Sequence, residues 1–269
     1  GDHGQPVDLS HSAALGQHVT KAIHDGKRRA DLPGRRYRDR IASGMLHVQT
    51  QGRRVGQVNG LAVVSAGALA YGFPLRITAS VGPGSEGAIH LQREAMMSGQ
   101  IHTKGFLTVQ GLLRNFLVAP HPLTFDASIT HEQSYGGVDG DSASGAEFVC
   151  LMSAITGWAA HQGLAMTGAV DQHGHVLPVG AVDEKIEGFF DACAAQGLDG
   201  HQGVLIPGVA AGALQLRSDV VQACREGRFA IYAIDEIAQA LELILGQDVD
   251  AIRSKATAQL ADMWQASSP

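Results

Sequence analysis

The sequence has few cysteines and few aromatic residues, and it lacks a long uninterrupted apolar run. Three cysteines are spread over 269 residues, and aromatic residues make up 5% of the chain. So few cysteines at such wide spacing offer neither a disulfide framework nor a paired-cysteine metal motif, which favours a reducing, cytoplasmic location. The longest apolar stretch, residues 61–73, is interrupted by Ser65, Gly67 and Gly72. Because a bilayer requires roughly 20 apolar residues, we expect no membrane association.

Motifs for nucleotides and metals are also missing. A P-loop needs Ser or Thr after its Gly-Lys pair, whereas Gly26-Lys27 is followed by Arg28, so any ATPase that uses ATP and magnesium must lie elsewhere. The chain contains 13 histidines but no His-Glu-x-x-His segment. His173 and His175 flank a predicted turn, where we expect surface histidines rather than ligands. The sequence therefore predicts neither a metal nor a cofactor in this chain.

What is present indicates a folded protein rich in tight turns. Apolar residues make up 45% of the chain, charged residues 17%, and glycine accounts for 34 positions. The formal net charge is −6, yet residues 27–40 carry seven Lys or Arg side chains. This basic segment is interpreted as a solvated helix face, with a patch for nucleic acid or an acidic partner as the alternative. Because no aromatic residues are interleaved with it, nucleic acid is not the expected partner.

The order of predicted elements favours an α+β fold. The first part of the chain predicts a helix over 12–26, strands over 46–50, 56–65, 75–81 and 88–93 with antiparallel pairing, a helix over 102–118 and a strand over 123–130. The second part predicts a helix over 143–156, a hairpin of 164–170 with 175–179, a helix capped by Asp183 that ends at Gly197, strands over 203–207 and 229–234, and helices over 219–226, 235–245 and 250–266. These patterns divide the chain into a helical, basic lead-in (1–45), a central domain (46–247) and a C-terminal helix or tail (248–269).

Ser142 is the first candidate nucleophile. It ends the glycine-rich loop 136–142 and stands at the predicted start of a helix, where unpaired N–H groups and the helix dipole stabilise negative charge. A serine that merely caps the helix is the alternative. Residues 140–144 also approach the Gly-x-Ser-x-Gly pattern of α/β-hydrolases. That pattern requires a preceding strand and a late histidine, and here a loop precedes the serine while His201 alone follows residue 175.

Lys185 is the candidate base. It lies near the predicted N-terminus of a helix, among apolar residues such as Ile186 and Phe189. The positive end of the helix dipole and burial both favour the neutral amine. The acidic residues Asp183, Glu184 and Glu187 would oppose this effect if they faced the amine, and a solvated lysine in an acidic first turn is the alternative.

Three motifs follow one another along the chain: Gly-Val-Asp-Gly-Asp-Ser-Ala-Ser over 137–144, Met-Thr-Gly over 166–168 and Gly-Ala-Val-Asp-Glu-Lys over 180–185. The arrangement resembles the proteolytic domain of Lon proteases, in which a serine in an Asp-Gly-x-Ser-Ala loop pairs with a lysine in a Gly-Gly-x-x-x-Lys segment. The similarity covers about residues 56–245. It is greatest to the Lon-like branch marked by Glu-Gln-Ser-Tyr over 132–135 and Lys-Ile-Glu-Gly-Phe-Phe over 185–190.

The resemblance implies a serine endopeptidase that uses a Ser-Lys dyad. Ser142 corresponds to the nucleophile, Lys185 to its general base, Thr167 to the threonine whose hydroxyl can hold the lysine, and Asp139 to the acid three residues before the serine, which we interpret as a loop organiser. It also implies an α+β fold similar to domain 2 of ribosomal protein S5. The resemblance further implies a homo-hexameric ring that hydrolyses unfolded or damaged polypeptides. It implies a role in ATP-dependent protein quality control, with an ATPase module that is separate or missing from this chain.

Two positions depart from the common Lon pattern. Asp141 stands where many Lon enzymes have proline, and Ala181 replaces the second glycine of the lysine segment. A carboxylate next to the nucleophile would raise the pKa of the lysine, unless Asp141 faces solvent or caps the helix. Two other function classes remain open, namely a catalytically dead ring scaffold or regulatory protein and a serine hydrolase of small esters or amides.

Overall fold

A computed structural model describes residues 39–41, 43–66, 69–84, 89–93, 100–117, 123, 125–133 and 141–267. The predicted helix over 12–26, most of the basic segment and Asp139 lie outside these residues. Nothing in the structure tests the predicted division of the chain into a lead-in, a central domain and a tail, and that division stays a prediction.

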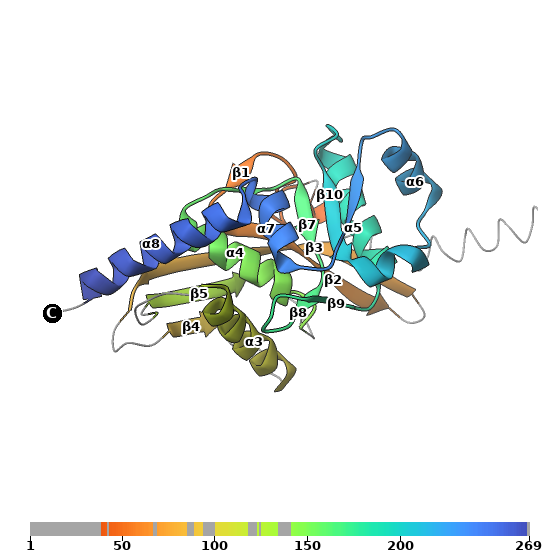
Figure 1. Cartoon of the computed structure of the whole chain (residues 1–269). Coiled ribbons are helices and arrows are strands. Elements are labelled where there is room, and N and C mark those ends of the chain that lie inside the picture. Colours follow the sequence, from red (N-terminus) through yellow and green to blue (C-terminus); the bar gives the residue numbers. More distant parts are fainter. Residues whose placement is uncertain are drawn as a thin grey trace, which may run out of the picture.

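A seven-stranded mixed sheet forms the centre of the described chain (Figure 1). In spatial order its strands are β11 (Ala230–Ile234), β10 (Gly203–Pro207), β7 (Leu164–Met166), β2 (Gln57–Ala66), β3 (Leu69–Pro83), β5 (Phe125–His131) and β4 (Ile89–Arg93). The pairs from β11 to β2 are parallel. The strands β2 and β3 pair antiparallel, as the sequence predicts, and β3 also pairs antiparallel with β5. The pair β4 and β5 is parallel. Two small two-stranded sheets join β1 (Arg53–Arg54) to β6 (Ala160–His161) and β8 (Ala169–Val170) to β9 (Val176–Leu177).

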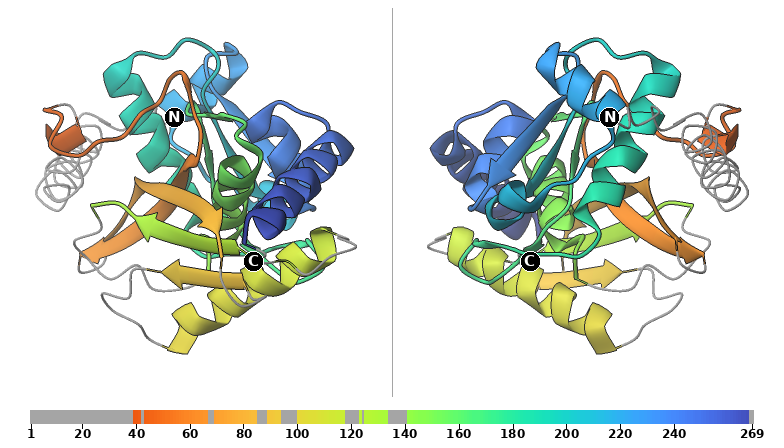
Figure 2. Two further views of the ribbon diagram at one scale, coloured as in Figure 1. Left: turned by 90° about the vertical axis from the view of Figure 1, so that its left-hand side faces the viewer. Right: turned by 90° about the vertical axis from the view of Figure 1, so that its right-hand side faces the viewer.

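Helices cover both faces of this sheet (Figure 2). On one face lie α3 (Gln100–Phe116), α4 (Ser144–Thr156), α7 (Ile237–Leu245) and α8 (Val249–Ser267); on the other lie α5 (Val182–Gln196), the short 3-10 helix η1 (Gly208–Ala213) and α6 (Ser218–Arg225). Alternation along β10 serves both layers, because Leu205 joins the first core while Val204 and Ile206 join the second. The result is the mixed α and β architecture that the element order predicts.

Helix α4 is the central helix of the first layer. Every residue in it except Ala154 is buried, because all but Glu147 have apolar or small side chains, and Glu147 Oε1 lies 2.8 Å from His131 Nε2. Its Phe148 ring meets Phe116 of α3 edge-on at 5.6 Å, and α8 packs along it (Figure 1). This packing fixes the N-terminal end of α4, which begins two residues after Ser142.

Three details of the predicted topology are wrong. Residues 46–50 form no strand, because amide side chains bind their backbone: Gln196 Nε2 donates to the carbonyl of Val48, and Asn59 Nδ2 donates to that of Gln49. The predicted long hairpin is also split. Residues 164–166 join the main sheet between β2 and β10, so that only β8 and β9 form a hairpin. Finally, β4 does not pair antiparallel with β3, the strand that precedes it in the chain. In the sheet β5 lies between these two strands, and β4 pairs parallel with β5.

No helix in the described part of the chain has the length and apolar character needed to cross a membrane. The three cysteines are free thiols, with Cys150 and Cys193 buried and Cys224 partly buried. Burial raises the pKa of all three thiols, which disfavours the reactive thiolate.

Candidate active site

Lys185 enters the interior from the first turn of α5. The residue is 3% exposed, and its Nζ donates a hydrogen bond of 3.2 Å to Thr167 Oγ1, which is fully buried just beyond the end of β7. Burial lowers the pKa of Lys185 from its ordinary value, because the ammonium loses its hydration. The structure therefore brings together two of the predicted site residues and supplies the apolar surroundings that favour a neutral amine.

Close backbone contact holds this helix against the sheet. A Cβ atom on Gly72 of β3 would lie 1.9 Å from the carbonyl oxygen of Glu184, and one on Gly188 would lie 2.0 Å from the carbonyl oxygen of Gly72. Only glycine at both positions allows α5 and β3 to approach so closely. The approach covers the first turns of α5 and leaves Lys185 little access to water.

Two acidic residues of α5 face away from Lys185. Asp183 Oδ1 accepts a hydrogen bond of 3.0 Å from the backbone N–H of Gln215, and Glu187 Oε1 accepts one of 2.8 Å from that of Arg217. The prediction that Asp183 caps the helix is wrong. The N-cap position is Ala181, whose backbone is left-handed with a φ of 56°.

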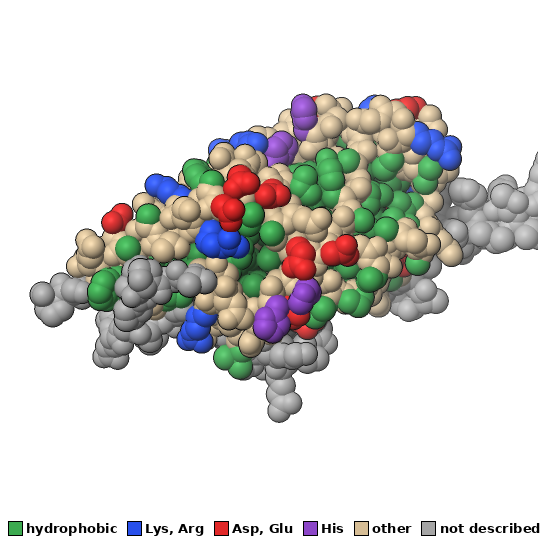
Figure 3. All heavy atoms as spheres, viewed as in Figure 1, with side chains coloured by type: hydrophobic (Ala, Val, Ile, Leu, Met, Phe, Trp, Pro, Cys, Tyr) green, Lys and Arg blue, Asp and Glu red, His purple; other side chains and the backbone are tan. Residues whose placement is uncertain are grey.

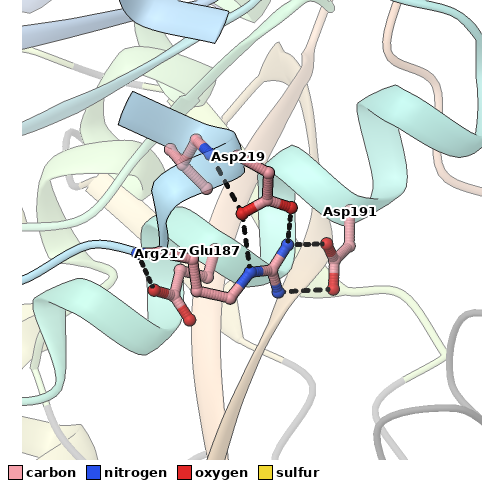
Figure 4. Close-up of polar contacts among 5 residues, drawn as sticks. Glu187, Asp191, Arg217 and Asp219 are labelled. Atoms are coloured by element: carbon pink, nitrogen blue, oxygen red, sulfur yellow. Dashed lines mark hydrogen bonds and ion pairs between the residues drawn. The ribbon is translucent and has the colours of Figure 1, made fainter. Parts of the chain in front are cut away.

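The side chain of Arg217 completes this outer network (Figure 4). It donates to both carboxylate oxygens of Asp191 at 2.6 and 3.2 Å and to both of Asp219 at 2.9 and 3.1 Å. The hydrogen bond to Asp191 raises the pKa of Arg217, and Arg217 in turn lowers the pKa of Asp219. Burial raises the pKa of Glu187 in the same network. The carboxylates of Asp183, Glu187 and Asp191 thus have their hydrogen-bond partners on the side of the helix opposite the lysine.

Ser142 lies in the turn that precedes α4, and not at the first helical position as predicted. The helix begins at Ser144, its N-cap is Ala143, and no side chain caps it, so the structure gives no support to Ser142 as a capping residue. Backbone hydrogen bonds tie this turn to the segment after β7. Gly168 N donates to the carbonyl oxygen of Ser142 at 3.0 Å, and Gly145 N donates to that of Gly168 at 3.1 Å. The turn with Ser142 is therefore bonded to the residue next to Thr167.

Asp141 is partly buried in the same turn. Its backbone carbonyl accepts a hydrogen bond of 2.9 Å from Ser144 N, and its Cβ lies 3.7 Å from the position that a Cβ on Gly105 of α3 would take. Burial is the cause that lowers the pKa of Lys185. The effect of the Asp141 carboxylate on Lys185 stays a prediction.

The two turn histidines lie on the surface, as predicted. His175 Nδ1 is 2.7 Å from Asp171 Oδ2, which raises the pKa of His175 and, through the same hydrogen bond, helps to lower that of Asp171 to about 2. Figure 3 shows histidine side chains in separate places on that face rather than in one cluster. Among the residues that the structure describes, no group of three or more His, Cys, Asp or Glu side chains has the arrangement of a metal site.

Comparison with known proteins shows the family of this chain. Residues 45–247 match the model of the Lon protease (S16) C-terminal proteolytic domain. The chain belongs to the Lon protease family. It is 39% identical over 232 residues to a protein of Escherichia coli (strain K12) and 44% identical over 211 residues to one of Haemophilus influenzae, both provisionally named Lon protease homologs. It is 31% identical over 251 residues to the archaeal Lon protease of Archaeoglobus fulgidus.

These alignments cover most of this chain but a minority of each relative. They span 86%, 78% and 89% of the chain and 40%, 35% and 36% of the E. coli, H. influenzae and A. fulgidus proteins, respectively. The match therefore identifies a Lon-type peptidase domain, and the chain spans less than half the length of each of these relatives.

The Lon pattern explains one unusual backbone position. Ala181 stands where the Lon lysine segment has glycine, and its φ of 56° and ψ of 42° place it in the left-handed region. Glycine adopts this conformation without the steric cost that a Cβ imposes, which is about 1–2 kcal/mol. At the position where the Lon pattern has glycine, this chain therefore forms the left-handed turn with alanine.

Sequence reasoning missed Arg217. Its partners on α5 lie 26 and 30 residues earlier in the chain, and no local periodicity connects them. The one available signal was the spacing of Asp183, Glu187 and Asp191, which repeats every four residues and therefore predicts a single acidic stripe on α5. A stripe of this kind indicates a basic partner without saying which residue supplies it.

Proposed function

We propose that this chain is a serine endopeptidase in which Ser142 is the nucleophile and Lys185 its general base. The observation that carries the proposal is the buried Lys185 amine, 3.2 Å from the Thr167 hydroxyl, beside a backbone segment that is bonded directly to Ser142. Because burial lowers its pKa, the Lys185 amine accepts a proton from a neutral state that is more populated than in a solvated lysine. Thr167 then acts as a positioning residue for the amine.

The proposed reaction is acyl transfer to water. Neutral Lys185 takes the proton of the Ser142 hydroxyl, and the resulting alkoxide attacks the carbonyl carbon of a peptide bond. The ammonium of Lys185 then returns the proton to the leaving amine, which leaves an acyl group on Ser142. Water, deprotonated by the same lysine, attacks this ester and restores the free serine.

We propose the N–H groups of Ser142 and Ala143 as donors to the oxyanion. The next two N–H groups are already used, because Ser144 N donates to Asp141 and Gly145 N donates to Gly168. Within the described residues, no hydrogen bond uses the N–H groups of Ser142 and Ala143. Both stand just before the N-terminus of α4, where the helix dipole favours negative charge.

We also propose the setting of this activity by analogy with the Lon pattern. Unfolded or damaged polypeptides are the substrates, a homo-hexameric ring is the assembly, and an ATPase module outside this chain supplies the ATP-dependent step. Within the ring, Asp139 organises the loop that precedes Ser142, and the domain has the fold of ribosomal protein S5 domain 2. The mechanism requires no cofactor in this chain, and free buried thiols are compatible with the cytoplasm.

One comparison tests the proposal. Hydrolysis of an unfolded protein, such as reduced casein, is measured for the parent chain, Ser142→Ala and Lys185→Met, and each protein is also treated with a serine-directed covalent probe. We expect hydrolysis and labelling by the parent alone. Full activity in Lys185→Met would point to a histidine-dependent hydrolase of small esters or amides. A folded parent that neither hydrolyses nor labels would point to a scaffold.

A further inference from the structure

A second concave site lies outside the Lys185 and Thr167 region. A cleft of about 420 Å³ separates residues 41–49 from the sheet, and its other side is lined by Arg54, Gln57, Arg76 and Gln196. This volume is within the range of roughly 300–1,000 Å³ that is typical of small-molecule sites. None of the predicted catalytic residues lines it.

The charge of this cleft is opposite to that of the chain. Arg54 and Arg76 line it, and among the described residues that line it there is no Asp or Glu. The whole chain carries a net charge of −6. A concentration of cationic side chains within an acidic protein is a local feature, and it favours an anionic ligand.

The guanidinium of Arg76 is incompletely paired. Its Nε is buried without a hydrogen-bond partner, and its Nη2 lies 3.8 Å from Glu132 Oε2, a long separation for an ion pair. A buried charged donor without an acceptor costs more free energy than a neutral one, so its retention calls for an explanation. The guanidinium of exposed Arg54 has neither a hydrogen bond nor an ion pair with another described residue. Two donor groups are thus available at the cleft.

The amide side chains of the cleft are already occupied. Gln57 Nε2 donates to Gln49 Oε1 at 3.0 Å and to Gln162 Oε1 at 2.7 Å, and Gln196 bonds the backbone of Val48. These bonds attach Val48 and Gln49, in the wall formed by residues 41–49, to α5 and to β2, respectively. No Phe, Tyr or Trp is among the lining residues that the structure describes, so these residues offer a nucleobase no ring of that kind to stack on. Recognition is therefore left to the guanidinium groups, whose fork geometry suits an oxyanion.

We propose that this cleft binds a small oxyanion, in the form of a phosphate or a carboxylate group, between Arg54 and Arg76. The bound anion accepts hydrogen bonds from both guanidinium groups, and it supplements the long contact of Arg76 Nη2 with Glu132. Because residues 41–49 form one wall, the anion also fastens the chain that leads into the domain. The proposal is independent of the peptidase activity, and its test needs no substrate.

Isothermal titration of the whole chain with inorganic phosphate tests the site, with citrate as the carboxylate arm and ionic strength held constant with sodium chloride. We expect saturable binding of at least one anion to the parent. Arg54→Gln weakens it about tenfold, the effect of losing one charge-assisted hydrogen bond. Arg225→Gln, at an exposed position on α6 outside the cleft, binds as the parent does. Phosphate binding alone identifies a phosphate ligand, and citrate binding alone identifies a carboxylate.

Arg76→Gln gives a second, independent variant, and we expect it to weaken binding at least as much as Arg54→Gln does. Circular dichroism establishes whether it is folded, and if it is not, Arg54→Gln decides the question. Amide hydrogen exchange over residues 41–49 provides the structural readout, with slower exchange expected when the anion is bound to the parent. Equal affinity for the parent and both folded arginine variants, or no binding of either anion above the chloride background, would overturn the proposal.

Discussion

The two faces of α5 place charged side chains in opposite environments. On the inner face, Lys185 is 3% exposed and has the Thr167 hydroxyl as its hydrogen-bond partner. On the outer face, Asp183 and Glu187 accept hydrogen bonds from backbone N–H groups, and Asp191 is paired with Arg217. A residue two positions from Asp183 and Glu187 points about 200° away around an α-helix. The same helix therefore carries an isolated amine on one side and a compensated acidic stripe on the other.

This difference shows how a lysine can be kept free of the acids in its own helix turn. The pKa of Lys185 is lowered by burial, and the carboxylates of Asp183 and Glu187, two residues before and after it, accept hydrogen bonds from other segments. An isolated buried amine favours its neutral form, whereas an amine paired with a carboxylate favours the ammonium. We therefore regard the outer network as part of what makes Lys185 suitable as a base.

Removing either member of the proposed dyad has the largest expected effect. Ser142→Ala and Lys185→Met each lower the rate of peptide hydrolysis by about 10³-fold or more, because the two groups act as one unit. The double variant is expected to be no slower than either single variant. Steady-state hydrolysis of an unfolded protein checks this, and a double variant with the product of the two single losses would show that the residues act separately.

Removing the hydroxyl that holds the amine is the next largest change. Thr167→Val keeps the shape of the side chain but removes the oxygen that accepts the hydrogen bond from Lys185. We expect kcat to fall about 100-fold, within the range of general-base contributions. Thr167→Ser is the matched control, since it retains the hydroxyl and should keep most of the activity. Equal losses in both variants would indicate a packing effect instead.

Breaking the outer network tests whether the two faces are coupled. Arg217→Gln leaves Asp191 and Asp219 without their cationic partner, and we expect unfolding to become easier by about 1–2 kcal/mol, a value reduced by the partial exposure of the pair. With the acids less compensated, the pKa of Lys185 rises and the rise of activity with pH moves to higher pH. Denaturant unfolding and the pH profile of hydrolysis measure the two effects. An unchanged pH profile in a folded variant would show that the faces are independent.

The inner face also makes a prediction for stability. Because the pKa of Lys185 is lower in the folded than in the unfolded state, the unfolded chain binds the proton more tightly. The cost to stability is fully present below the folded pKa and disappears as the pH rises through the ordinary value of about 10.4. Lys185→Met should therefore be more stable than the parent by about 1 kcal/mol at pH 7, and less so at pH 10. Denaturant unfolding at both pH values would refute this if the variant gained nothing at pH 7.

Relief of backbone strain at the start of α5 is the smallest expected change. Ala181→Gly removes the Cβ from a left-handed residue, which stabilises the fold, while the greater freedom of glycine in the unfolded chain offsets part of the gain. We expect a net increase of about 0.5 kcal/mol in the free energy of unfolding. The same substitution at Ala258, in the exposed part of α8, serves as a control and should destabilise.

The sequence predicted the parts of the site that lie in short local motifs. Lys185 was identified from its segment and Thr167 through the resemblance to Lon proteases, and the structure joins them by a hydrogen bond. The strand over 203–207 and the helix ending at Gly157 were also correct, because apolar patterning and a left-handed C-terminal glycine are local signals. The roles of all four residues, Ser142, Lys185, Thr167 and Asp139, stay predictions.

What could not be predicted depends on contacts between distant parts of the chain. Residues 46–50 have the pattern of a strand, but amide groups of Asn59 and Gln196 satisfy their backbone instead. The segment 164–166 was assigned to a hairpin, although its partners lie about 40 and 100 residues away in β10 and β2. Ala181 in a left-handed conformation and Arg217 in the outer network likewise have no local signal. Each miss is a case in which tertiary contacts decided the structure.

The most direct test of the central claim is the pH dependence of acylation at Ser142 by a serine-directed probe, compared between the parent and Lys185→Met. We predict that the parent is labelled at a rate that rises with pH and levels off well below the ordinary lysine pKa of about 10.4, while the variant is folded and unlabelled. Labelling of the variant at the parent's rate, or a parent profile that still rises at pH 10, would contradict an uncharged Lys185 as the base for Ser142.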